Sequence, residues 1–170
     1  MKKILFVCTG NSCRSVMAEG LLRHMMEKKG RADIQILSAG VSTLGGHGAT
    51  LETIEVMQQE GIDVSGHIGQ PVTPDLIRRA DAIFCMEEFH RDAILSLVPE
   101  AASKTHLLKT FQARGRVMDP NITDPIARPK EVYESCFMTI KEAVERVARW
   151  LTKESQEAQT GDEREESDPG

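Results

Sequence analysis

The sequence lacks long hydrophobic runs and an excess of positive charge. No stretch approaches the roughly 18 consecutive apolar residues of a membrane-spanning helix, so we expect no membrane span. The net charge is −5, which argues against a nucleic-acid partner, because a nucleic-acid surface needs a basic patch. With 40 % hydrophobic and 28 % charged residues over 170 positions, the composition is typical of one soluble globular domain.

The sequence also shows no export signal and no motif for a nucleotide or a metal. The opening MKKILFVCTG has too short an apolar run for a signal peptide, and no small-residue cleavage site follows it. We therefore expect a cytoplasmic protein whose four cysteines are free thiols rather than a disulfide framework. The sequence shows neither the G-x4-G-K-[ST] motif of a nucleotide-binding loop nor a cluster with metal-ligand spacing, so we expect no metal and no cofactor.

Strand-like and helix-like segments alternate along the chain. Short apolar runs predict strands, and apolar residues at helical spacing fill the intervals, ending in a long stripe at 132–151. The expected strands cover residues 3–7, 34–40, 82–86 and 106–108. This alternation predicts a three-layer α/β fold with a four-stranded parallel sheet and helices on both faces. Ligands of such folds bind at the carboxyl ends of strands, and the loop after the first strand lies at such an end.

The last part of the chain differs in composition from the rest. Residues 153–170 contain seven acids and two bases and almost no apolar residues. A segment of this kind cannot offset the entropy of ordering. We therefore predict a folded domain at 1–152 and a disordered, solubilising acidic tail at 153–170, with an acidic recruitment segment as the alternative.

The most informative stretch is CTGNSCRS at 8–15, which has the form C-x5-R-S. A loop between a strand and a helix turns successive backbone N–H groups toward one point and so binds an anion. Arg14 adds a planar fork that can hold two phosphate oxygens, and the same positive potential favours the thiolate form of Cys8. A thiolate beneath a bound phosphate is placed for in-line attack. The predicted phosphate-binding residues are Thr9, Gly10, Asn11, Ser12, Cys13, Arg14 and Ser15.

Displacing a poor leaving group from phosphorus also requires a proton donor, usually a carboxylic acid. Two candidates occur in VMDPNITDPIARPKEVYE, where Asp119 and Asp124 each precede a proline that favours an extended loop. Position in the sequence alone leaves both open.

The chain resembles the low-molecular-weight protein tyrosine phosphatase family. The similarity rests on VCTGNSCRSVMAEGLLR, SAG at 38–40, ADAIFCME and the late Asp-Pro before EVYESC. The resemblance implies a four-stranded parallel sheet and hydrolysis of phosphoproteins through a phosphocysteine, without metal. It assigns Cys8 as nucleophile, Arg14 as phosphate ligand and Asp124 as general acid, since Asp124 keeps the family's distance to Tyr133.

The resemblance also implies supporting roles around the loop. It places Asn11 and Ser15, together with Ser38 and His67, in a hydrogen-bond network that shapes the loop. It further suggests that Cys13 captures an oxidised nucleophile as a disulfide.

Three departures from the family bear on the substrate. Phosphotyrosine-specific members wall the pocket with aromatic residues where this chain has Leu44 and Ile126. At Ser12 they have a larger apolar residue, whereas the family's protein-arginine phosphatases have a small hydroxyl residue. We expect activity on phosphotyrosine in proteins, with phosphoarginine as the alternative. A thiol-linked arsenate reductase is a remote alternative, because its relay needs two further cysteines where this chain has only Cys85, inside a strand.

Overall fold

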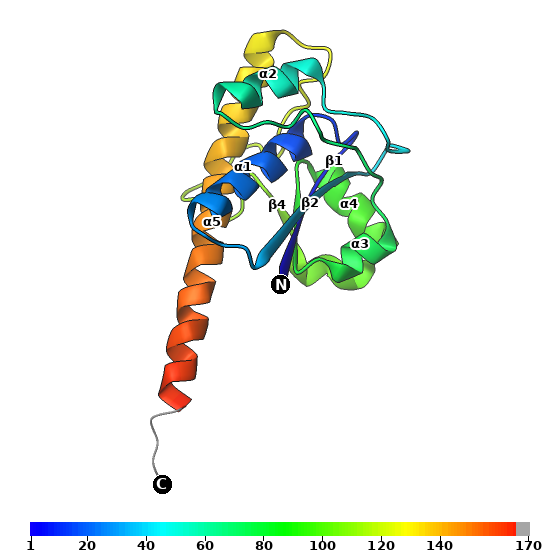
Figure 1. Ribbon diagram of the computed structural model, residues 1–170. Helices are drawn as coiled ribbons and strands as arrows, with labels where there is room; N and C mark the ends of the chain where they lie inside the picture. Colours follow the sequence, from blue (N-terminus) through cyan, green and yellow to red (C-terminus); the bar gives the residue numbers. More distant parts are fainter. Residues whose placement is uncertain (166–170) are drawn as a thin grey trace.

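A four-stranded parallel sheet forms the centre of the molecule (Figure 1). The computed structural model describes residues 1–165, and their side chains as far as residue 157. The strands are β1 (Lys2–Cys8), β2 (Ile34–Gly40), β3 (Ala82–Cys85) and β4 (Thr105–Leu107), in the order β2-β1-β3-β4. This arrangement confirms the predicted α/β fold with its four-stranded parallel sheet.

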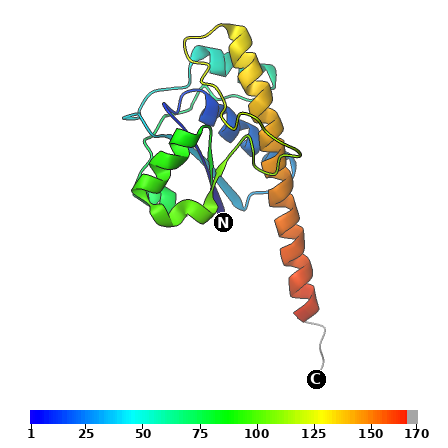
Figure 2. The same cartoon turned by 180° about the vertical axis from the view of Figure 1, so that it is seen from behind.

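Helices cover both faces of the sheet, as the unbroken apolar strands require. One face packs against α1 (Arg14–Lys28), α2 (Leu51–Gln59) and α5 (Lys130–Glu165), and the other against α3 (Pro74–Arg79), α4 (Glu88–Leu97) and the 3₁₀ helix η1 (Pro99–Lys104). Figure 2 shows the second layer from behind. Alternate β1 residues enter the two cores: Ile4 and Phe6 face α1 and α5, while Leu5 and Val7 face α3 and α4.

Helix α3 begins where its sequence signals predict. Thr73 is the N-cap and its hydroxyl accepts the N–H of Leu76 at 3.2 Å, and Pro74 occupies the first helical position, where its missing N–H costs nothing. None of the helices in the described part of the chain is long and apolar enough to cross a membrane.

The predicted boundary at residue 152 falls within helix α5, which runs without a break to Glu165, and residues 166–170 lie outside the described residues. Lys, Glu, Gln and Ala, which are strong helix formers, are frequent in this part of the helix. Lys2 pairs with Glu154, and the Ser155 hydroxyl donates to the carbonyl of Leu151 at 3.1 Å.

The order of the strands creates a switch point between β1 and β3. The chain passes from β1 to β2 on one side and later reaches β3 on the other side of β1. The crevice outside the carboxyl ends of such strands is the usual binding position in open α/β sheets. The loop 9–13 between β1 and α1 lies at this position.

Gly40, the last residue of β2, touches this loop so closely that a side chain has no room. A Cβ atom there would lie 2.6 Å from the Thr9 carbonyl oxygen and 3.0 Å from the Asn11 amide nitrogen. We expect Gly40→Ala to lower the free energy of unfolding by about 1–3 kcal/mol. Gly66→Ala is the matched control, because nothing lies within 4 Å of its Cβ position, and its effect should stay within about 0.5 kcal/mol. Urea denaturation measures both, and equal effects would contradict this account.

Candidate active site

The loop after β1 presents backbone N–H groups to its centre. Cys13 is the N-cap of α1 and makes no side-chain hydrogen bond to the first turn, so the N–H groups of that turn remain available to an anion. Asn11 has a φ of 56°, the left-handed region that Asn adopts more readily than most residues. This conformation folds the loop back on itself above Cys8.

The Asn11 side chain fixes the loop to two distant segments. Its Oδ1 accepts the backbone N–H of Gln70 at 3.0 Å. The amide group is thereby oriented, and its Nδ2 donates to Ser15 Oγ at 2.8 Å and to Ser38 Oγ at 2.9 Å. His67 Nε2 donates to the Asn11 carbonyl at 2.9 Å. The residues that the resemblance assigned to loop support therefore lie together around Asn11.

Further contacts surround the same loop. The Ser38 hydroxyl donates to the Glu19 carboxylate, and His47 Nε2 donates to the Gly10 carbonyl at 2.8 Å. The sequence analysis did not identify Glu19 or His47, because each contacts the loop only through the tertiary fold.

The sulfur of Cys8 receives two hydrogen bonds at the base of the loop. Because Ser15 Oγ already accepts from Asn11, its own hydrogen is free to donate to Cys8 Sγ, 2.9 Å away. The Asn11 N–H donates to the same sulfur at 3.2 Å. Hydrogen-bond donors in these positions lie at the side of the sulfur that faces the loop.

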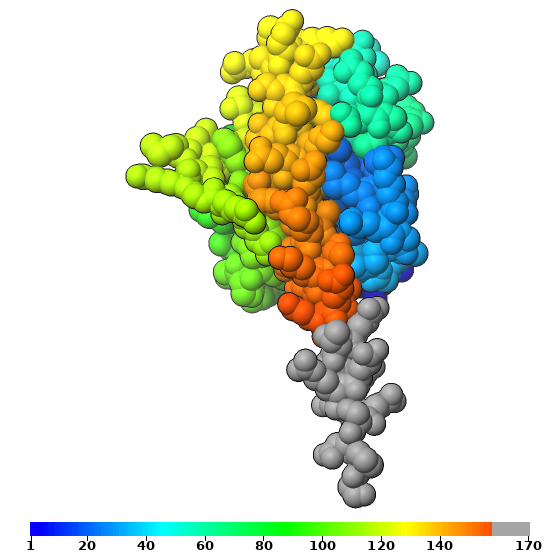
Figure 3. Space-filling view, turned by 90° about the vertical axis from the view of Figure 1, so that its left-hand side faces the viewer, coloured from blue at the N-terminus to red at the C-terminus, as the bar shows by residue number. Residues whose placement is uncertain are grey.

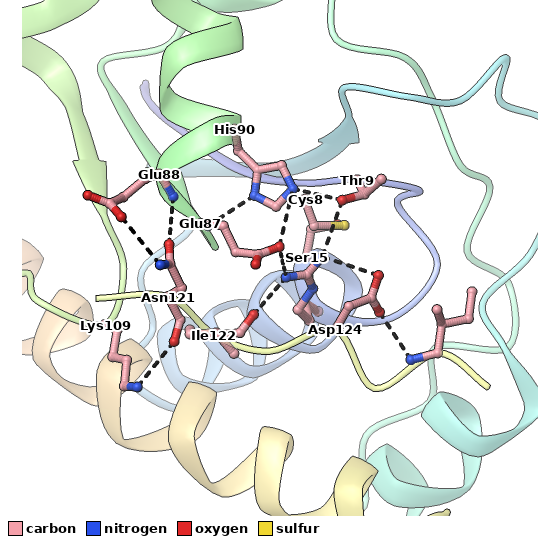
Figure 4. A network of polar contacts seen from close by, with 12 residues as sticks. Cys8, Thr9, Ser15, Glu87, Glu88, His90, Lys109, Asn121, Ile122 and Asp124 are labelled. Atoms are coloured by element: carbon pink, nitrogen blue, oxygen red, sulfur yellow. Dashed lines mark hydrogen bonds and ion pairs between the residues drawn. The ribbon is translucent and has the colours of Figure 1, made fainter. Parts of the chain in front are cut away.

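Arg14 is almost fully buried, with 1 % of its surface exposed, and its guanidinium is held on several sides. Nη1 donates to Glu87 Oε2 and to the Ile122 carbonyl, both at 2.7 Å. Nη2 donates to Thr9 Oγ1 at 3.3 Å and lies 3.4 Å from Asp124 Oδ2. Figure 4 shows Thr9, Glu87, Ile122 and Asp124 gathered beside Cys8. A buried charge with this many partners is fixed in position.

Glu87 and His90 are site residues that the sequence analysis missed. They follow β3, which lies next to β1, so polar residues directly after this buried strand were the available signal. His90 Nδ1 accepts the N–H of Glu87 at 3.0 Å, so Nε2 carries the proton and donates to Thr9 Oγ1 at 2.8 Å. Thr9 Oγ1 also accepts from Arg14, which leaves its hydrogen to donate to a bound group.

The structure distinguishes the two candidate acids. Asp124 Oδ2 faces Arg14, and its Oδ1 accepts the N–H of Ile126 at 3.0 Å. Asp119 is exposed and accepts the N–H of Asn121 at 2.9 Å. Of the two carboxylates, Asp124 is the one positioned beside the loop.

The expected pocket walls are open and lack aromatic rings. Leu44 is completely exposed and Ile126 is 51 % exposed. Ser12 is half-buried, with its Oγ 3.8 Å from Cys13 Sγ. A substrate would therefore meet aliphatic groups and a hydroxyl at the rim.

All four cysteines are free and buried, but they differ in surroundings. Cys13 Sγ lies 3.4 Å from Thr50 Oγ1 and 3.9 Å from the Tyr133 hydroxyl. Burial raises the pKa of Cys85, within β3, and of Cys136, on α5, to about 12. These two thiols are packed in the core and are protonated at neutral pH. Among the described residues, no three His, Cys, Asp or Glu side chains gather as a potential metal site.

Such a loop suits the transfer of a phosphoryl group to sulfur, with a carboxylic acid at hand for the leaving group. By fold and site, the molecule falls in the class of cysteine-dependent phosphatases. Comparison with known proteins narrows this class.

Residues 3–157 match the family model described as "Low molecular weight phosphotyrosine protein phosphatase". The chain is 35 % identical over 152 residues to a protein-arginine-phosphatase of Geobacillus stearothermophilus, covering 89 % of this chain and 97 % of that protein. It is 34 % identical over 140 residues to a putative low molecular weight protein-tyrosine-phosphatase of Klebsiella pneumoniae, covering 82 % of this chain and 90 % of that protein.

Solved structures give the same result. The YwlE arginine phosphatase from Geobacillus stearothermophilus superimposes with a TM-score of 0.82 at 34 % identity, covering 92 % of this chain and 97 % of that one. The tyrosine phosphatase Wzb from Escherichia coli K30 superimposes with a TM-score of 0.77 at 34 % identity, covering 88 % of this chain and 98 % of that one. The chain belongs to the low molecular weight phosphotyrosine protein phosphatase family.

The buried His90 makes stability depend on pH. Burial, together with the nearby Arg14 charge, lowers the pKa of His90 from 6.5 to about 3. Below pH 6.5 the imidazole of His90 takes up a proton in the unfolded chain, whereas in the folded protein it does not do so until about pH 3. The free energy of unfolding therefore decreases as the pH is lowered from 6.5 to about 3. We expect a loss of about 2 kcal/mol between pH 7 and pH 5 from this residue. In urea denaturation at both pH values, His90→Gln should show a correspondingly smaller loss, and equal losses would contradict the assignment.

Proposed function

We propose that this protein hydrolyses phosphorylated side chains of other proteins through a phosphocysteine intermediate. The observation that carries the proposal is the Cys8 sulfur, hydrogen-bonded by Ser15 and Asn11 at the base of an anion-binding loop that also holds Arg14. Phosphotyrosine is the first proposed substrate, since the chain belongs to a family named for that activity.

In the first step, the Cys8 thiolate attacks phosphorus and forms the S–P bond. The bond from phosphorus to the substrate oxygen breaks, and Asp124 gives its proton to that oxygen as the group leaves. Arg14, the Thr9 hydroxyl and the loop N–H groups stabilise the phosphoryl oxygens. Because these donors are already fixed, little reorganisation is needed as charge develops.

In the second step, water attacks phosphorus and the S–P bond breaks. The Asp124 carboxylate takes a proton from this water, so the acid of the first step is the base of the second. Inorganic phosphate leaves and the Cys8 thiolate is restored, with the Ser15 hydroxyl donating to the departing sulfur. The cycle consumes water and needs no metal or cofactor.

The nucleophile and the acid can be tested separately. Cys8→Ser should abolish turnover of p-nitrophenyl phosphate. Asp124→Asn should slow phenyl phosphate, whose leaving group needs a proton, by about 10²–10⁴-fold, but p-nitrophenyl phosphate much less. Steady-state kinetics with both esters measures the difference.

Asp119→Asn is the matched control for the acid, because Asp119 is the other Asp-Pro aspartate and contacts Asn121 instead of Arg14. A larger effect at Asp119, or equal losses on both esters at Asp124, would refute the assignment. Turnover that survives in Cys8→Ser would refute the proposed function itself.

Phosphoarginine is a second candidate substrate, favoured by the rim of the site. The exposed aliphatic walls Leu44 and Ile126 offer no ring to stack on a phenyl group, and Ser12 places a hydroxyl where a guanidinium could bind. Similarity to the arginine phosphatase from Geobacillus stearothermophilus supports the same candidate.

A hydroxyl deletion at Ser12 discriminates between these substrates. If Ser12 hydrogen-bonds a guanidinium, Ser12→Val should lower kcat/KM for a phosphoarginine peptide by about tenfold or more, while Ser12→Thr should retain it. Turnover of the matching phosphotyrosine peptide should change little in either variant. A parallel fall for both peptides in Ser12→Val would contradict a hydroxyl contact with the guanidinium.

The reduced state of the cysteines is relevant to where the protein works and to its redox chemistry. A phosphocysteine cycle needs a reduced Cys8, which fits a reducing compartment such as the cytoplasm. We retain the proposal that Cys13 protects an oxidised Cys8 as a disulfide. The remote reductase alternative is disfavoured, because Cys85 is buried in β3 with its pKa raised to about 12 and so makes a poor electron relay.

A further inference from the structure

A basic groove lies beside the proposed site on an otherwise acidic protein. It encloses about 790 Å³ between the segment 109–117, which follows β4, and the α5 face at 139–153. Figure 3 shows that segment projecting beside α5. Five cationic side chains and a single carboxylate, Glu142, line the groove, the cations being Lys109, Arg114, Arg146, Arg149 and Lys153.

The walls of this groove are held together by Arg146. Its Nε donates to the Phe111 carbonyl at 2.9 Å and its Nη2 to the Lys109 carbonyl at 2.7 Å, while Nη1 pairs with Glu142 at 3.6 Å. Phe111 also packs edge-on against Trp150, with ring centroids 5.4 Å apart. The walls of the groove are therefore held in place, and its lone carboxylate, Glu142, lies beside Arg146.

The groove adjoins a second hollow that extends toward the segment carrying Asp124. This hollow, of about 360 Å³, shares Lys109 and Thr139 with the groove. That hollow is lined by Asn121, Ile122 and Thr123, the residues that lead directly into Asp124. A polypeptide bound at Cys8 can thus continue along α5 toward exposed Arg114 and Arg149.

We propose that this groove docks an acidic stretch of the phosphorylated protein substrate, an inference that rests on the proposed function. A row of cations along a groove, with Arg114, Arg149 and Lys153 exposed, complements a single chain bearing several carboxylates. The acidic residues of α5 after Lys153 do not serve as well, because the helix runs on past the groove and reaches about 18 Å beyond Lys153 at Glu165.

The test compares phosphopeptides that differ only in a run of Glu or Gln, placed on either side of the phosphorylated residue. The wild-type protein should prefer the Glu peptides by about tenfold in kcat/KM, through KM, and the preference should fall with added salt. Arg114→Gln with Arg149→Gln should remove the preference without changing turnover of p-nitrophenyl phosphate.

Arg78→Gln with Arg79→Gln is the matched control, since it removes the same charge from exposed positions on α3, across the sheet. This control should keep the preference. Equal rates for Glu and Gln peptides in the wild type, or a preference that survives in the groove variant, would overturn the proposal while leaving Cys8-dependent turnover intact.

Two other occupants are distinguished by direct measurements on the full chain. Sedimentation that shows a wild-type dimer lost in the groove variant would assign the groove to the acidic end of a second copy. Cosedimentation of the wild type, but not of the groove variant, with vesicles containing phosphatidylserine would assign it to a membrane surface. Either result would overturn docking of the substrate.

Discussion

The Ser15 hydrogen bond to the Cys8 sulfur depends on the orientation of one amide group. The Gln70 N–H donates to Asn11 Oδ1, which turns Asn11 Nδ2 toward Ser15 and leaves the Ser15 hydrogen free to donate to the sulfur. A residue 59 positions away from Asn11 in the sequence thus helps to orient the contacts inside the C-x5-R loop. The same amide holds Asn11 in its left-handed conformation, which shapes the loop that surrounds the phosphate. The chemistry of the loop therefore depends on the tertiary fold as much as on the motif.

Burial of Arg14 places a second demand on the fold. A guanidinium with 1 % of its surface exposed is stable only when its donors are satisfied and its charge is offset. The carboxylate of Glu87, which follows β3, offsets the positive charge. The carbonyl of Ile122, in the segment that carries Asp124, accepts a hydrogen bond from the guanidinium. Because β1 and β3 are neighbours in the sheet, the loops after them meet at the switch point. The separate contact with the Ile122 carbonyl holds the segment that carries Asp124 beside the same guanidinium.

The sequence predicted what is local in this molecule. The unbroken apolar strands and the compact Cys8–Ser15 motif each follow from short-range rules. Glu87 and His90 could not be predicted in this way, because only the adjacency of β1 and β3 brings them to Thr9 and Arg14. The end of α5 at Glu165 could not be read from composition, because helix added to an already formed upstream helix needs no new nucleus.

The phosphate-binding groups of the loop do not distinguish one phosphorylated side chain from another, because their donors would contact only the oxygens bound to phosphorus. Discrimination between substrates must therefore come from groups outside the loop. Leu44 is completely exposed. A substrate that buries this side chain with any apolar surface would bind more tightly by about 1.5–3 kcal/mol of free energy. The Ser12 hydroxyl and the cations along α5 add terms that depend on polarity and charge. In the proposed mechanism, the interior of the loop directs transfer of a phosphoryl group to sulfur, and the open rim of mixed chemistry selects the protein from which that group is taken.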